Sequence, residues 1–141
     1  MNKSSAAPTK TASLNYIKYF ELARDKQKTP NGDWNAWLIL AGRGFGKTWT
    51  GAYDLVNYAL KNPKTINAVI APTFGDLRRV CFEGVSGINS LIPKECYANK
   101  RGVGFNRSTA EIHLWNGSKI IGFAASEPDR LRGSQYHRAW C

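Results

Sequence analysis

The apolar positions of the chain form two kinds of pattern, continuous runs and runs with helical spacing. Continuous runs lie at residues 37–41 (WLILA) and 67–71 (NAVIA), and each predicts a strand that is buried on both faces. A helical spacing follows each run, over residues 47–60 and 74–84. Strand, helix, strand and helix in this order predict an α/β fold with a mostly parallel sheet flanked by helices.

The segment before the first run has a different character. Residues 1–13 are small and polar, whereas the apolar and aromatic residues over 14–23 fit a short amphipathic helix. A connector rich in turn residues follows at 26–33 (KQKTPNGD). We therefore expect residues 1–33 to be a lead-in with one short helix and residues 34–141 to belong to the folded domain.

The last third of the chain predicts a local antiparallel element. Residues 111–115 and 119–124 flank Asn116-Gly117, a strong signal for a β-hairpin. Residues 126–135 then have the composition of a loop, and residues 137–141 return to an apolar run.

Composition and charge narrow the functional classes. Hydrophobic residues make up 43% of the chain and charged residues 21%, which is ordinary for a folded globular protein and argues against disorder. The net charge of +10 points to a polyanionic partner such as nucleic acid, although the excess is spread along the chain. No apolar run is long enough to span a membrane. Three cysteines without C-x-x-C spacing argue against a disulfide framework or a zinc site.

Residues 41–48 (AGRGFGKT) carry the most specific chemistry in the chain. They match the phosphate-loop pattern G-x-x-x-x-G-K-[ST], except that Ala41 stands in place of the first glycine. A predicted strand precedes the loop and a predicted helix follows it, as the motif requires. A glycine-rich turn that binds nothing has no need for a lysine at the start of its helix. We therefore predict a nucleotide-binding site formed by Ala41, Gly42, Arg43, Gly44, Phe45, Gly46, Lys47 and Thr48.

The residue types in this loop suit a bound nucleotide. Glycines let successive backbone N–H groups curl around an anion, and the following helix presents the positive end of its dipole. Lys47 would contact the β- and γ-phosphates of ATP, and the Thr48 hydroxyl would bind Mg²⁺. Arg43 is either a solvated loop residue or a cation that contacts the γ-phosphate, and its position favours neither.

Other candidate residues have plainer interpretations. We expect Trp37 to pack in the core, whereas Trp34 is either core or a stacking surface for an adenine ring. Cys81 lies on the apolar side of a predicted helix and suits packing. His113 and His137 are too isolated in the sequence to predict a metal site.

Three segments together resemble the large terminase subunit of tailed bacteriophages. They are "WLILAGRGFGKTWTGA", "AVIAPTFGDLRRVCFEGVSGI" and "ASEPDRLRGSQYHRAWC", in order over residues 34–141. The resemblance implies a partial P-loop NTPase of the additional-strand (ASCE) class, in which ATP and Mg²⁺ drive double-stranded DNA into a capsid. It also implies a portal protein and a small terminase subunit as partners, a homo-oligomeric ring, and action in the host cytoplasm at the procapsid portal. A nuclease domain is a separate part of such proteins.

The resemblance also implies individual roles. Lys47 and Thr48 match the phosphate and magnesium positions, and Arg43 matches an arginine that senses or stabilises the γ-phosphate. Arg132 resembles the arginine that reaches into a neighbouring subunit's site, and Arg130 competes for that role.

One part of the family pattern is missing. In the family, an apolar strand like residues 137–141 leads into an Asp-Glu pair that holds Mg²⁺ and polarises the attacking water, and no such pair follows here. We therefore expect a fold that is incomplete at the C-terminus and very slow hydrolysis by this chain alone. Two alternatives stay open: a helicase-like nucleic-acid-dependent ATPase, and a non-catalytic fragment that binds nucleotide or DNA.

Overall fold

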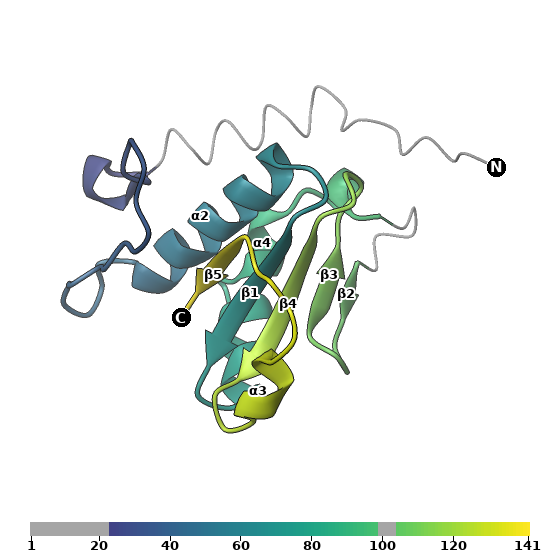
Figure 1. The fold of residues 1–141 in the computed structure, drawn as a ribbon. Helices are drawn as coiled ribbons and strands as arrows, with labels where there is room; N and C mark the ends of the chain where they lie inside the picture. Colours follow the sequence, from purple (N-terminus) through teal and green to yellow (C-terminus); the bar gives the residue numbers. More distant parts are fainter. Residues whose placement is uncertain (1–22, 99–103) are drawn as a thin grey trace.

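A five-stranded sheet is the centre of the structure, a computed structural model that describes residues 23–98 and 104–141. The strands lie side by side in the order β2-β3-β4-β1-β5 (Figure 1). Their bounds are Ile66–Ala71 (β1), Phe105–Asn106 (β2), Glu111–His113 (β3), Lys119–Ala124 (β4) and Arg138–Trp140 (β5). With helices beside this sheet, the predicted α/β class is confirmed.

The sheet is mixed, which corrects the prediction of a mostly parallel one. β1 pairs in parallel with both β4 and β5, but β3 pairs antiparallel with β2 and β4. The cause is the hairpin at Asn116-Gly117, which was predicted correctly: Gly117 has a φ of 82°, and the chain reverses there between β3 and β4. The hairpin therefore places the antiparallel strands β2 and β3 at one side of the parallel strands β4, β1 and β5.

Both predicted helices are present, and the second has an irregular form. The first is α2 (Lys47–Lys61). The second begins as α3 (Phe74–Asp76), where the Thr73 hydroxyl accepts a hydrogen bond from the Asp76 N–H, and continues as a wider π-helix, η2 (Leu77–Phe82). The shorter elements are η1 (Asp25–Gln27), α4 (Ile88–Leu91), η3 (Lys94–Cys96) and η4 (Pro128–Leu131). Residues 14–22 of the predicted N-terminal helix lie outside the described residues.

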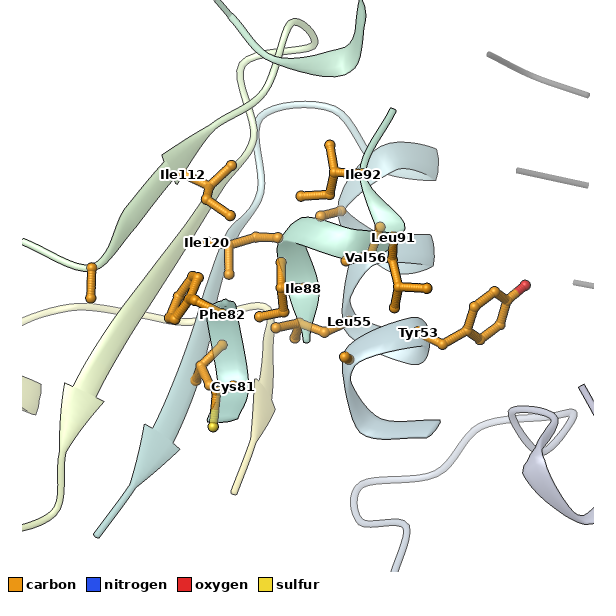
Figure 2. Packing of buried hydrophobic residues seen from close by; sticks show 14 of the residues in the cluster. Tyr53, Leu55, Val56, Cys81, Phe82, Ile88, Leu91, Ile92, Ile112 and Ile120 are labelled. Atoms are coloured by element: carbon orange, nitrogen blue, oxygen red, sulfur yellow. The ribbon is translucent and has the colours of Figure 1, made fainter. Parts of the chain in front are cut away.

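The hydrophobic core lies between one face of the sheet and the helices α2, η2 and α4. Figure 2 shows Leu55 of α2, Phe82 of η2 and Ile88 of α4 beside Ile112 and Ile120 of the sheet. All five side chains are fully buried. The register places Ile112 beside Ile120 and Ile120 beside Asn67 of β1, a buried polar residue. Val69 and Ala71 follow on the same face of β1 and belong to the apolar cluster.

The two apolar runs that predicted buried strands have different outcomes in the structure. Residues 67–71 do form β1, but Ile70, which points away from the helices, is half-buried rather than buried. The predicted strand at 37–41 is wrong: this run is irregular, and Leu38 and Leu40 are 77% and 86% exposed. A strand needs a backbone partner. Within the described residues none pairs with this run, although β5 has a free edge.

The end of α2 is fixed by the tip of the hairpin. The Asn116 side-chain amide donates to the carbonyl oxygens of Ala59 (2.8 Å) and Leu60 (3.2 Å), which belong to the last turn of the helix. These carbonyls have no intrahelical partner at a helix end, so Asn116 satisfies them from outside. Ser118 donates to the Asn62 carbonyl beside them (2.8 Å).

Candidate nucleotide-binding site

The glycine-rich loop adopts a backbone that only glycine takes easily. Gly44 and Gly46 have φ angles of 84° and 90°, in the left-handed region. Gly46 is also the residue that caps α2, which begins at Lys47, and its carbonyl accepts the first helical hydrogen bond from Thr50 N–H (2.9 Å). The N–H groups of the first helical turn are therefore directed toward the loop, as anion binding at a helix start requires.

Lys47 joins the two ends of the loop. Its ammonium Nζ donates to the carbonyl oxygens of Ala41 (2.6 Å) and Gly42 (3.0 Å). The contact uses only the backbone of residue 41, so any residue type can supply it. This explains why Ala41 is compatible with the loop in place of glycine.

The other polar side chains of the loop are accessible. Arg43 is exposed, and Thr48 is half-buried in the first turn of α2. A Cβ placed on Gly42 or Gly44 would meet nothing within 4 Å, which means that open space lies beside both residues. The loop therefore has room, donors and a cation for an anionic ligand.

The outer side of the loop is held by residues that the sequence did not single out. The Phe45 carbonyl accepts hydrogen bonds from the Arg24 guanidinium and from Gln27 Nε2 (2.9 Å). Gln27 ends the short helix η1 and is buried, with 7% of its surface exposed. No motif marks a glutamine in a turn-rich connector, so this contact becomes visible only in the fold.

A match to a family model covers most of the chain. The family described as "Terminase large subunit, T4likevirus-type, N-terminal" matches residues 38–141. The chain belongs to this family. No curated protein and no solved structure matches the chain. Membership indicates a role in phage DNA packaging, which takes place in the host cytoplasm. It favours the terminase interpretation of the motifs over the helicase-like one.

In this terminase chain, Trp34 belongs to a cluster that fastens the connector to the domain. The Arg138 guanidinium lies over the rings of Trp34 (4.7 Å) and Tyr58 (4.2 Å), and its Nη1 is 3.1 Å from Asp54 Oδ1. The Thr29 hydroxyl donates to the same carboxylate oxygen (2.5 Å). One face of Trp34 is thus occupied by a side chain of β5.

The Trp37 interpretation was only partly right. Its ring contacts Trp34 edge-on at 6.2 Å, and the residue is half-buried rather than part of the core.

The two candidate trans-acting arginines lie beyond β4, in and after η4. Arg130 is 3.5 Å from Glu127, and Arg132 is 3.4 Å from Asp129. Both arginines are exposed. Each ion pair is local, between residues three apart in sequence, and exposed pairs of this kind contribute little to stability.

The surroundings of Cys81, Cys96 and His137 in the terminase chain indicate a structural role for these residues. Cys81 is buried in the core, and burial raises its pKa. Burial also raises the pKa of Cys96 to about 11, with Glu95 adding to the effect. The backbone N–H of Ile66 donates to His137 Nδ1 (3.1 Å), so this histidine secures the start of β1. His113 is exposed beside Glu111 (3.4 Å).

The described residues form neither a metal cluster nor a membrane-spanning helix. No group of three or more His, Cys, Asp or Glu side chains there is arranged to hold a metal ion. Within the same residues, no helix has the length and apolar character needed to cross a membrane.

Proposed function

We propose that residues 41–48 bind ATP with Mg²⁺, and that this chain contributes the front part of an ATPase motor that moves double-stranded DNA into a capsid. The observation that supports the proposal best is the position of Lys47. It is the first residue of α2, and its ammonium closes a loop whose two left-handed glycines and helix start favour an anion.

The residues present fit ATP and Mg²⁺. Lys47 would exchange its contacts with the loop carbonyls for contacts with the phosphates, because both are oxygen acceptors and a phosphate carries more charge. Thr48 would hold Mg²⁺ through its hydroxyl, and the bound ion would neutralise charge on the phosphates. Arg43 is exposed on the same loop and would contact the terminal phosphate.

Hydrolysis needs a further group that positions and polarises water. A carboxylate is the usual choice, supplied in the family by an Asp-Glu pair, and no such pair occurs in this sequence. We propose that the 141-residue chain binds nucleotide but turns it over very slowly. Packing would take place at a portal, with a small terminase subunit as partner and a ring of copies in which Arg132 or Arg130 reaches the next subunit's site.

The test compares Lys47→Ala with Lys94→Ala, which removes an exposed lysine of η3 that lies outside the motif. Magnesium-ATP is added to each chain while backbone amide signals are followed by NMR. We expect the wild-type and Lys94→Ala chains to bind with equal affinity at loop residues, and Lys47→Ala to bind about ten- to a hundredfold more weakly. Equal binding by Lys47→Ala, or no binding by the wild-type chain, would contradict the proposal.

The slow turnover proposed for this chain has its own test. ATP turnover by the 141-residue chain should stay at background with and without duplex DNA. Turnover that rises when DNA is added would show that another residue of this chain activates water.

A further inference from the structure

The carbonyl of Phe45 is the point where residues 24–27 contact the phosphate loop. It accepts hydrogen bonds from two side chains, the Arg24 guanidinium and Gln27 Nε2 (2.9 Å). The guanidinium also lies over the Phe45 ring, 5.1 Å from its centroid. Both donors come from residues about twenty positions earlier in the sequence. A single backbone oxygen of the loop is therefore held by two side chains of another segment.

The orientation of the Gln27 amide is fixed by its neighbours. Its Oε1 accepts from the backbone N–H (3.1 Å) and from Nε (3.2 Å) of Arg24. This leaves Nε2 to face the loop, where it lies 2.8 Å from the position that a Cβ on Gly46 would occupy. Gly46 thus needs to be glycine for two reasons, its left-handed backbone and the side chain packed against it.

These contacts set the direction of one peptide group. In a planar trans peptide the C=O and the N–H of the next residue point in opposite directions. Holding the Phe45 carbonyl toward Arg24 and Gln27 therefore turns the Gly46 N–H the other way. In a phosphate loop that N–H is one of the donors that surround the anion.

We propose that Arg24 and Gln27 are positioning residues for phosphate binding, which we call the outer brace. The inference rests on the nucleotide-binding function proposed above. It identifies the contacts that make the loop rigid. Without the brace, the peptide between Phe45 and Gly46 rotates more freely, and a bound phosphate has to order it. The brace contacts the loop backbone, so it strengthens binding of every ligand that presents the same phosphates, whatever base is attached.

The experiment uses two changes at Gln27 and one control. Gln27→Glu keeps an oxygen acceptor for Arg24 but removes the donor to Phe45, and Gln27→Met keeps the size without either. Asp25→Asn is the control, because Asp25 lies on the same short helix and pairs with Lys28 instead of the loop. Affinity is measured by NMR titration for magnesium-ATP, magnesium-GTP and magnesium-tripolyphosphate. We expect both Gln27 variants to bind all three ligands about three- to tenfold more weakly, and Asp25→Asn to match the wild type.

A second readout needs no ligand. The ¹⁵N order parameter of the Gly46 amide should be that of rigid backbone in the wild type and should fall in Gln27→Met, while amides of α2 stay unchanged. Unchanged α2 amides also establish that the variant is folded.

Three results would overturn the brace. The first is wild-type affinity and a rigid Gly46 in Gln27→Met. The second is weaker binding of ATP with unchanged binding of tripolyphosphate, which would mean that Gln27 contacts the base. The third is a Gly46 amide that is already mobile in the wild type. If the wild-type chain binds none of the ligands, the proposed function fails and the brace has no phosphate to position, whereas loss of affinity confined to the Gln27 variants supports both.

Discussion

Replacing Gly51 by alanine should destabilise the protein, although the same change in most helices stabilises it. Gly51 lies in the first half of α2, where the Trp140 indole of β5 packs directly on its Cα. A Cβ there would be 2.2 Å from Nε1 and 2.5 Å from Cε2 of that ring. In an exposed helix interior, alanine in place of glycine gains about 1 kcal/mol.

The clash outweighs that gain. Carbon atoms in contact prefer about 3.5–4.0 Å, so the indole has to retreat by more than about 1 Å. Overpacking of this kind costs about 1–3 kcal/mol. Subtracting the helix gain, we expect Gly51→Ala to lower the free energy of unfolding by up to about 2 kcal/mol. Strand β5 is three residues long and lies at the sheet edge, so it is the part that moves.

The assay is urea unfolding of the full chain, followed by tryptophan fluorescence and circular dichroism. Gly75→Ala is the matched control: the nearest atoms to a Cβ on this helical glycine are Nη2 of Arg79 at 3.5 Å and Oγ1 of Thr73 at 3.7 Å, which is ordinary van der Waals contact, so alanine should be neutral or stabilising. Adding Trp140→Leu to Gly51→Ala should cost less than the two single changes predict together. The reasoning is refuted if Gly51→Ala unfolds at the same or a higher urea concentration than the wild type.

Two further predictions concern stability away from the loop. Asn116→Ala should lower the free energy of unfolding by about 1–3 kcal/mol, because it leaves the Ala59 and Leu60 carbonyls at the end of α2 without their donor; urea unfolding measures this, and an unchanged midpoint would contradict it. Stability should also fall as the pH rises from 9 toward 11, because burial keeps Cys96 protonated up to a pKa of about 11 whereas the unfolded chain loses that proton near 9. Between pH 8 and 10.5, deprotonation of this group should lower the free energy of unfolding by on the order of 2 kcal/mol. Cys96→Ala should therefore show a weaker pH dependence of stability. If stability falls with pH as steeply in that variant as in the wild type, Cys96 is not the cause.

Local patterns predicted the parts of the fold that depend on neighbouring residues. The spacing of apolar residues in α2 is set by the helical repeat, and the reversal at Asn116-Gly117 needs only two residues with the right backbone preferences. The loop glycines follow the same rule, because the left-handed backbone at Gly44 and Gly46 is a property of each residue.

Features that depend on distant partners could not be predicted in this way. The apolar run at 37–41 has the composition of a strand, but composition does not supply an adjacent edge. The contacts of Arg24 and Gln27 with Phe45 join segments 18 and 21 residues apart, and no periodicity records them. The short strand β2 likewise depends on a distant contact, because the ring of Phe105 stacks on that of Phe82 with 4.7 Å between the centroids.

The contacts that hold α2 in place affect how the protein folds during its synthesis. The helix is among the first described elements to leave the ribosome, yet two of the residues that hold it come much later: Asn116 lies 57 residues after Ala59, and Arg138 lies 84 residues after Asp54. Contacts at such separations form slowly, because the intervening chain must first be closed into a loop. The segment that carries the glycine-rich loop is thus synthesised early, whereas these two contacts form late. Until β4 and β5 are added beside β1, the sheet that covers the apolar side of α2 is incomplete.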